Sequence, residues 1–205
     1  EGNPIPVPKT FKEPEKPVPA PVERTGRPYT FKERKLTASE LEYWQQYGIT
    51  PEILEQSKVC SLVQFQSENA DGNPFSYSST MDEPIYGYKN KRFIKLYRPF
   101  SKTRFLYGGN IGESYCFGLE QLPSKGDTLF ITGGEKDVMS LAAHGFHAIC
   151  FNSETVTVPP NIIYKLTFRF KHIILLYDMD ATGVESAKKH EKQLCEYGVK
   201  RLLLP

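Results

Sequence analysis

Acidic side chains gather at two places in the second half of the chain, GGEKD at residues 133–137 and DMDATG at residues 178–183. In an extended backbone, alternation points Asp178 and Asp180 to the same side. Their oxygens are the ligands that Mg²⁺ and Mn²⁺ prefer, and like charges this close repel unless a cation joins them. The pair therefore predicts a divalent metal site. The alternative, carboxylates that merely cap helices, explains one acid per helix better than two on one turn.

Two kinds of enzyme place an acidic pair after an apolar strand. The sequence DMDAT at 178–182 fits the D-x-D-x-T nucleophile motif of haloacid dehalogenase-like phosphatases, but there the motif opens the domain and further catalytic residues follow far downstream. Only 25 residues follow Asp180 here. The other meaning is metal-dependent phosphoryl transfer, in which no protein nucleophile is needed. We favour the second.

A basic and aromatic segment runs from 84 to 112 and contains no acidic residue. Aromatic rings alternate with its seven cations, so groups that neutralise phosphates lie among groups that stack on bases. Within 93–98, a period of two puts Lys95 and Tyr97 on one face. An aromatic-rich sheet with solvated lysines is the alternative, which we favour less because protein surfaces normally mix both signs. The seven basic residues are Lys89, Lys91, Arg92, Lys95, Arg98, Lys102 and Arg104.

The elements that must position the acids alternate between strands and helices. The sequence predicts strands at 128–132, 147–151, 173–177 and 199–204, and helices at 135–144, after Pro159 and Pro160, and at 183–197. Apolar strands of this kind are buried on both faces, which favours a parallel sheet between helices. Sites in such sheets form beyond the carboxyl ends of the strands, where both acidic groups fall.

The N-terminal part has a different composition. Residues 1–29 hold eight of the sixteen prolines, which predicts a disordered linker. Two short helices follow, the first opened by a capping box of Thr37 and Glu40 and the second by Thr50 and Pro51. They could form a DNA-reading helix-turn-helix, but glutamates on the second helix make a poor surface for phosphates, so we expect a packing hairpin.

Composition limits the remaining classes of protein. The 205 residues carry a net charge of only +2, from 26 basic and 24 acidic side chains, so any nucleic-acid site must be local. No apolar run approaches the roughly 18 residues of a membrane helix. The closest pair of cysteines, Cys116 and Cys150, lies 34 positions apart. That spacing predicts no zinc in this chain, and the apolar or mixed segments around the cysteines predict buried free thiols and a reducing cytoplasm. The chain has no P-loop sequence.

The order of these motifs resembles a known family. From about Gly126 to Pro205, the pattern of strands, glycine-acid turn and D-x-D resembles the Toprim domain shared by bacterial-type primases, topoisomerases and some nucleases. The sequences KLYR at 95–98, KTRF at 102–105 and CFGL at 116–119 resemble the basic subdomain of phage primase-helicases and bacterial primases. The sequence YGIT at 47–50 is similar to the helical element that begins this subdomain.

This resemblance implies a bacterial or phage-type DNA primase catalytic core. The implied fold is a smaller mixed α+β basic subdomain over 30–122, then an α/β Toprim domain over 123–205 that is truncated at its C-terminus. The implied activity is RNA primer synthesis from ribonucleoside triphosphates on a single-stranded DNA template, with Mg²⁺ or Mn²⁺. Asp178, Asp180 and Glu135 would be the catalytic and metal-ligating acids. The expected phosphate contacts are Lys95, Arg98, Lys102 and Arg104.

The sequence departs from the family pattern at one important position. The first family motif is E-G-x-x-D, and matching Gly134 and Asp137 puts Gly133 where the glutamate belongs. Glu135, two positions on, could reach inward instead. A further acidic motif would follow the strand at 199–204. Two alternatives are therefore a non-catalytic single-stranded DNA-binding module and a Toprim nuclease. An upstream zinc-binding domain and a downstream region or helicase are expected in the parent chain.

Overall fold

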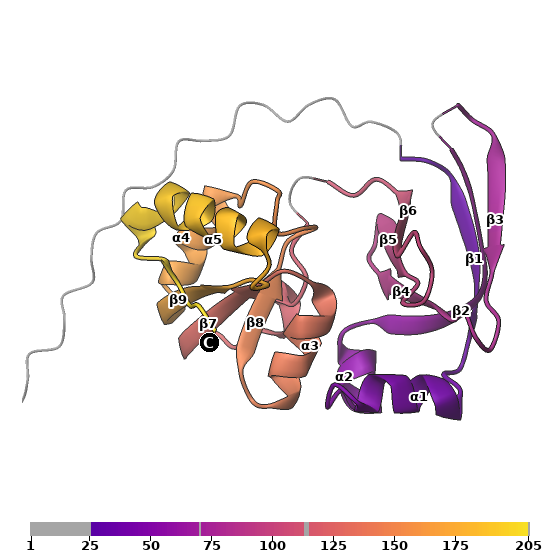
Figure 1. The fold of residues 1–205 in the computed structure, drawn as a ribbon, viewed down its shortest axis with the longest axis horizontal. Coiled ribbons are helices and arrows are strands. Elements are labelled where there is room, and N and C mark those ends of the chain that lie inside the picture. Colours follow the sequence, from indigo (N-terminus) through magenta and orange to yellow (C-terminus); the bar gives the residue numbers. More distant parts are fainter. Residues whose placement is uncertain (1–25, 70, 113–114, 205) are drawn as a thin grey trace, which may run out of the picture.

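The computed structural model describes residues 26–69, 71–112 and 115–204, which form two units (Figure 1). The predicted linker over 1–29 lies outside these residues up to position 25. The first unit is an antiparallel sheet in the order β1-β2-β4-β5-β6, with β3 paired to β2. Its elements are β1 (Tyr29–Arg34), α1 (Ala38–Gln45), α2 (Pro51–Gln56), β2 (Val59–Glu68), β3 (Pro74–Ser78), β4 (Ile85–Lys89), β5 (Phe93–Tyr97) and β6 (Phe105–Gly109).

The second unit is a parallel sheet, as the sequence predicted, and its strands lie in the order β10-β9-β7-β8. Its elements are η1 (Leu119–Gln121), β7 (Gly126–Thr132), α3 (Glu135–Ala143), β8 (His147–Cys150), α4 (Pro160–Thr167), β9 (Phe170–Leu176), α5 (Ala181–Gln193), η2 (Cys195–Tyr197) and β10 (Lys200–Arg201). The expected architecture, a smaller mixed α+β unit followed by an α/β unit with a parallel sheet and helices, is confirmed.

The last strand is much shorter than the predicted 199–204. Arg201 pairs with Leu175, and the backbone N–H of Leu202 still donates to the Leu175 carbonyl. Beyond this point β9 ends and its chain turns toward Asp178, so no strand remains for Leu203 to pair with. Three apolar residues in a row predicted a buried strand, but they are exposed.

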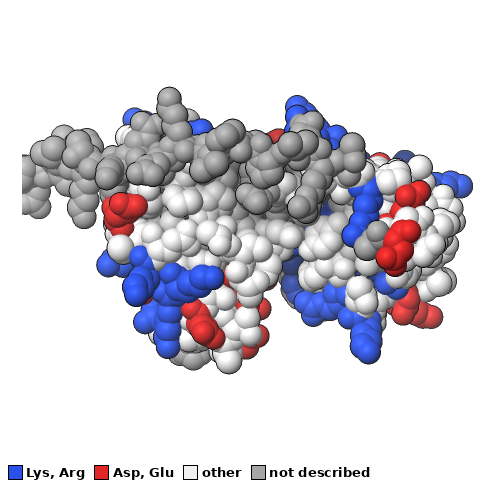
Figure 2. Space-filling view, turned by 90° about the horizontal axis from the view of Figure 1, so that it is seen from above, with Lys and Arg blue, Asp and Glu red and all other residues white. Residues whose placement is uncertain are grey.

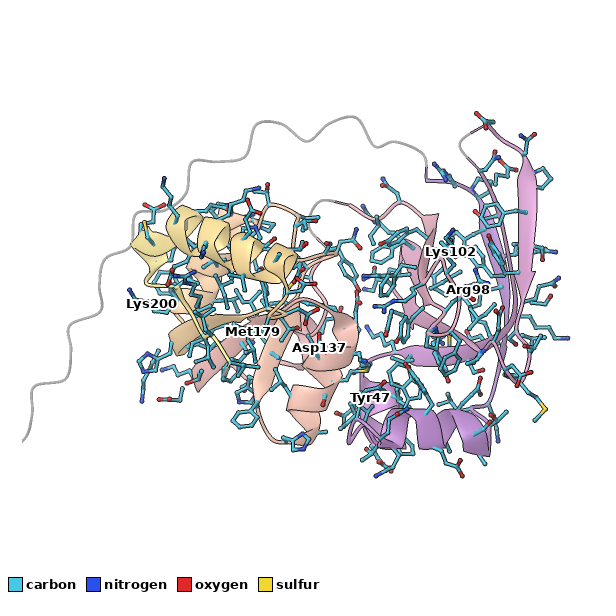
Figure 3. All side chains as sticks on the ribbon, in the orientation of Figure 1. Tyr47, Arg98, Lys102, Asp137, Met179 and Lys200 are labelled. Atoms are coloured by element: carbon cyan, nitrogen blue, oxygen red, sulfur yellow. The ribbon has the colours of Figure 1, made fainter. Side chains whose placement is uncertain are left out.

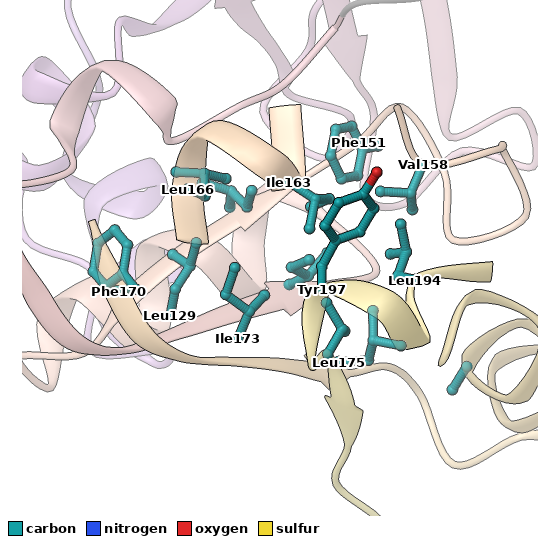
Figure 4. Packing of buried hydrophobic residues seen from close by; sticks show 14 of the residues in the cluster. Leu129, Phe151, Val158, Ile163, Leu166, Phe170, Ile173, Leu175, Leu194 and Tyr197 are labelled. Atoms are coloured by element: carbon teal, nitrogen blue, oxygen red, sulfur yellow. The ribbon is translucent and has the colours of Figure 1, made fainter. Parts of the chain in front are cut away.

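Helices cover both faces of the parallel sheet, because successive side chains of each strand point to opposite faces. Leu129 and Ile131 of β7 pack with Ile163 of α4 and Ala187 of α5 in the main core (Figure 4). On the other face, Val138 of α3 packs with residues of β8. This is the sandwich that the apolar strands predicted.

The two N-terminal helices form a packing hairpin, as expected. The Thr37 side chain accepts a hydrogen bond from the Glu40 backbone, and the Glu40 carboxylate accepts one from the Thr37 backbone, which completes the predicted capping box. Trp44 is fully buried, and its ring centroid lies 4.9 Å from that of Tyr86 in the sheet. Because this apolar side anchors the hairpin to β4, its function here is packing.

No helix in the described part of the chain is long and apolar enough to cross a membrane. All four cysteines are free, and the prediction of buried thiols is correct for Cys60 and Cys150. Cys116 is half-buried. The prediction is wrong for Cys195, which is exposed because the turn η2 carries it at the surface after α5.

Candidate active site

Three loops that carry acids meet at the carboxyl edge of the parallel sheet. Strand β7 lies between β8 and β9, and its last residue, Thr132, pairs with Cys150 on one side and Leu176 on the other. The loops after these strands therefore leave the sheet side by side. Gly133, Gly134 and the first turn of α3 follow β7, and residues 178–180 follow β9, as predicted. The loop after β8 adds Glu154, which the sequence motifs did not select.

Asp178 and Asp180 are both exposed, but their surroundings differ. Asp180 is the N-cap of α5, and its Oδ1 accepts a hydrogen bond of 2.8 Å from the backbone N–H of Gly183. Asp178 lines a pocket of about 270 Å³ together with Asp137 and Met179, which Figure 3 labels. Helix capping therefore accounts for one oxygen of Asp180 but not for Asp178, which lines the pocket beside α3.

The carboxylates at this edge act on one another electrostatically. Burial raises the pKa of Asp137 above its ordinary value, and the negative charge of Asp178 raises it further. Burial also raises the pKa of Glu154, and the charges of Asp178 and Asp180 add to that effect. Four acids therefore share one negative region, and each added charge makes it less favourable to keep the others ionised.

The donor chemistry of this edge fits a hard divalent cation. All of the ionisable groups named above are carboxylates, and Glu154 Oε2 is buried without a hydrogen-bond partner. A divalent cation would balance these charges and supply the missing partner. Within residues 26–204, excluding positions 70, 113 and 114, no three His, Cys, Asp or Glu side chains are yet close enough to hold a metal together. Binding would therefore require the exposed aspartates to rotate toward the ion.

Glu135 and Lys95 form a buried ion pair that joins the two units. Only 1% of the Glu135 side chain and 3% of the Lys95 side chain are exposed, and Lys95 Nζ lies 2.7 Å from Glu135 Oε1. The Tyr115 hydroxyl donates to the same oxygen at 2.7 Å, and Lys95 Nζ also donates to the Asn152 carbonyl at 3.0 Å. Burial and the charge of Glu135 raise the pKa of Tyr115, which keeps this hydroxyl protonated as a donor.

This ion pair places Lys95 and Glu135 in an environment different from the one that the sequence predicted for them. Strand β5 is buried along its whole length, so the face that Lys95 shares with Tyr97 is internal rather than a surface for phosphates. Lys95 Nζ lies 4.7 Å from the centroid of the Phe105 ring, which completes its enclosure. The structure thus brings Glu135 together with Lys95, while Asp178 and Asp180 lie on the exposed loop after β9. The assigned roles in catalysis and phosphate contact stay predictions.

The remaining predicted basic residues lie on or near the β5–β6 loop (Figure 3). Lys102 and Arg104 are exposed. Arg98 is largely buried, with its guanidinium 4.3 Å from the centroid of the Tyr77 ring and 3.7 Å from the Glu83 carboxylate. Acids from outside the segment offset part of its charge, because Lys89 pairs with Glu33 and Lys95 with Glu135. Figure 2 shows that the face seen from above carries side chains of both signs. The seven-to-none charge count therefore overstates the local field.

Comparisons with known proteins agree with this architecture. Residues 130–205 match the Toprim-like family. The primase fragment of the bacteriophage T7 primase-helicase superimposes with a TM-score of 0.58 at 16% identity, over 93% of this chain and 74% of that one. The chain has the fold of a primase catalytic core. No curated protein matches the sequence significantly.

Bacterial primases have the same fold. The DnaG primase catalytic domain bound to single-stranded DNA matches with a TM-score of 0.61 at 16% identity, over 82% of this chain and 66% of that one. The E. coli primase catalytic core matches with a TM-score of 0.59 at 15% identity, over 80% and 64%. The chain therefore spans about two thirds of the length of these cores. The Toprim-like part of the fold is the parallel-sheet unit, within which residues 130–205 match the family.

Two acids at the candidate site were missed by sequence reasoning. Asp137 lies within the GGEKD group but was used only to align the family motif. Glu154 lies four positions after β8, and its loop contains no second acid that would have formed a recognisable motif. The rule that sites form beyond the carboxyl ends of parallel strands applies to β8 as much as to β7 and β9, and it could have identified Glu154.

Replacing Gly183 by alanine tests how tightly the Asp178 loop is held. A β-carbon at this position would lie 2.2 Å from the Asp178 carbonyl oxygen and 2.9 Å from its carbon, so the backbone must move. Alanine in a helix normally gains about 1 kcal/mol over glycine. We expect Gly183→Ala instead to lower the free energy of unfolding by about 1–3 kcal/mol, measured with urea. Glu185→Ala, at an exposed position of α5, is the control and should change little; a stabilising Gly183→Ala would contradict the expectation.

Proposed function

We propose that the chain is the core of a primase-type RNA polymerase that synthesises RNA primers on single-stranded DNA by metal-dependent nucleotidyl transfer. The observation that carries the proposal is the shared negative region of Asp137, Asp178 and Glu154 at the carboxyl edge of the Toprim-like sheet. The exposed basic loop with Lys102 and Arg104 belongs to the adjoining unit. The DnaG domain of similar fold binds single-stranded DNA, which supports the same class of template.

In this proposal Asp178 and Asp180 hold Mg²⁺ or Mn²⁺. Asp137 lies close enough for the charge of Asp178 to raise its pKa. The bound cation would neutralise charge on the phosphates of the incoming nucleotide and its leaving group. Lys102 and Arg104 contact the template backbone. Glu135 has a positioning role, because its carboxylate holds Lys95 and Tyr115 at the junction of the two units.

A primer-synthesis assay tests the proposal directly. The chain is incubated with single-stranded DNA of mixed sequence, the four ribonucleoside triphosphates and either Mg²⁺ or Mn²⁺, and labelled RNA is resolved by length. We expect short RNA products that require both the template and the metal, and that disappear with a chelator. Template-bound protein that yields no RNA with either metal would contradict the proposed activity.

Single-stranded DNA binding should depend steeply on salt. Each phosphate contact contributes about 0.7 to the slope of log K against log salt, so Lys102→Ala combined with Arg104→Ala should reduce this slope by about 1.4. The control is Lys125→Ala with Lys171→Ala, which removes two exposed charges near the amino ends of β7 and β9. Fluorescence anisotropy at several salt concentrations measures the slope. Equal slopes for the two double variants would remove Lys102 and Arg104 from the interface.

A non-catalytic single-stranded DNA-binding module is the second candidate. It is favoured by Gly133, which offers no carboxylate, and by Glu135, whose carboxylate is engaged by Lys95. A module of this kind would bind DNA with the same salt dependence but would neither make RNA nor respond to divalent metal. Measuring anisotropy and primer synthesis on the same preparation distinguishes the two candidates.

Several expectations concern the parent chain and stay proposals. The matching T7 protein is a fragment of a primase-helicase, which supports an attached helicase in this case as well. An upstream zinc-binding domain for reading the template is proposed on the same resemblance, and a cytoplasmic location is proposed on the free cysteines. A cloned longer chain assayed for zinc content and for unwinding would test the first two.

A further inference from the structure

Glu154 reaches the acidic edge from the opposite side of β7 to Asp178. It belongs to the loop between β8 and α4, whereas Asp178 follows β9, and β7 lies between these strands. Neighbouring parallel strands lie about 4.8 Å apart, so side chains from the two outer loops can meet above the end of the central strand. The residue at that point of β7 is Gly133.

The glycine at 133 leaves the space that the Glu154 carboxylate occupies. A β-carbon built at Gly133 would lie 3.2 Å from Glu154 Oε2, which is tighter than ordinary van der Waals contact. The backbone does not require glycine here, because the φ angle of Gly133 is not among the positive values that L-residues avoid. The absence of a side chain at position 133 therefore leaves space for the Glu154 carboxylate.

The contacts of Glu154 leave one of its oxygens without a partner. The backbone N–H of Asp178 acts on the carboxylate and offsets part of the rise in the pKa of Glu154, which places this side chain beside the loop that carries the predicted metal ligands. Oε2 is buried and accepts no hydrogen bond from any described group. An unpartnered buried carboxylate oxygen is costly. The neighbouring charges that act on it, from Asp178, Asp180 and Asp137, are all negative, so a cation is the partner that this oxygen lacks.

We propose that Glu154 is a ligand of the same divalent cation as Asp178, and that it supplies from the β8–α4 loop the carboxylate that position 133 does not provide. The inference rests on the proposed function, because it assumes that Asp178 binds the cation. It adds a residue that neither the sequence motifs nor the family resemblance assigned. In this arrangement the role of Gly133 is to leave space for the Glu154 carboxylate, because any larger side chain would press on it.

Binding of Mn²⁺ alone, measured by electron paramagnetic resonance on the full chain, tests this inference without relying on activity. Glu154→Gln keeps the size of the side chain and one acceptor oxygen but removes the charge, and we expect Mn²⁺ affinity to fall by about 10-fold or more. Gly133→Ala should also weaken binding, because its β-carbon displaces Oε2. Glu185→Gln on the exposed side of α5 is the matched control and should leave the affinity unchanged. Circular dichroism establishes that each variant is folded.

The Asp178→Asn variant separates failure of this inference from failure of the proposed function. If Asp178→Asn and Glu154→Gln both weaken Mn²⁺ binding, the shared site is supported. If only Asp178→Asn weakens it, Glu154 does not bind the cation and the inference is overturned, while the proposed function stands. If neither variant differs from wild type, the cation does not bind at this edge, and both the inference and the proposed function are overturned.

Discussion

Replacing Lys95 by methionine is expected to lower the free energy of unfolding by about 3–5 kcal/mol. The substitution keeps the length of the side chain but removes its charge, and Glu135 is then left buried with only the Tyr115 hydroxyl as a partner. Breaking one side of a buried pair costs more than the pair itself contributes, because the remaining charge has no compensation in an apolar interior. Urea unfolding at neutral pH measures the loss.

The double variant Lys95→Met with Glu135→Gln identifies the origin of that loss. With both charges removed and the Tyr115 acceptor kept, we expect it to recover most of the stability that Lys95→Met loses. Lys102→Met is the matched control, since Lys102 is exposed, and it should change the stability by no more than about 0.5 kcal/mol. A Lys95→Met protein as stable as this control, but with weaker DNA binding, would favour the phosphate contact that the sequence predicted for Lys95.

Local patterns in the sequence were sufficient to predict most of the fold. The side chains of Thr37 and Glu40 each accept a hydrogen bond from the other residue's backbone N–H. Because both residues lie within four positions, the capping box can be recognised without knowing the rest of the molecule. The apolar strands of the Toprim-like domain are buried on both faces by helices that alternate with them in the chain. The strand at 199–204 was predicted too long, because apolar content cannot reveal that its neighbour β9 ends at Leu176.

The candidate site was predicted less completely, for a physical reason. Asp178 and Asp180 lie two positions apart in the sequence, and their predicted chemistry follows from that spacing. By contrast, Lys95 meets Glu135 across 40 positions, and Glu154 meets Asp178 only because β8 and β9 flank β7. Period-two alternation correctly put Lys95 and Tyr97 on one face, but it carries no information on whether another unit covers that face. Long-range pairing of this kind depends on how the two units pack.

Replacing Asp178 by asparagine is expected to abolish primer synthesis while stabilising the metal-free protein. If Asp178 is a direct metal ligand, its loss should reduce synthesis by about 100-fold or more, the upper end of the effect of removing groups that merely support a ligand. Asp127→Asn, at the amino end of β7, removes an exposed carboxylate far from the loops that follow the strands and should leave synthesis unchanged. Equal RNA yields from Asp178→Asn and wild type would exclude Asp178 as the ligand.

The stabilisation follows from the raised pKa values of Asp137 and Glu154. An acid whose pKa is higher in the folded state destabilises the fold above that folded pKa, and has no such effect below its ordinary value, 3.8 for Asp137 and 4.5 for Glu154. Asp178 contributes to both increases, so its neutralisation should relieve part of this penalty at pH 7. Because Asp178 is exposed and screened by solvent, we expect a gain of only about 0.5–1 kcal/mol.

The difference in stability between wild type and Asp178→Asn should depend on pH. Urea midpoints of the metal-free wild type and Asp178→Asn should diverge as the pH rises above 4.5, with the variant more stable, and should converge below 3.8, where Asp137 and Glu154 are protonated in both proteins. Saturating Mn²⁺ should reverse the order, because only the wild type gains binding energy from the cation. A variant that is less stable than wild type at pH 7 without metal would mean that Asp178 makes a favourable structural contact, and that repulsion among these carboxylates does not limit the stability of the fold.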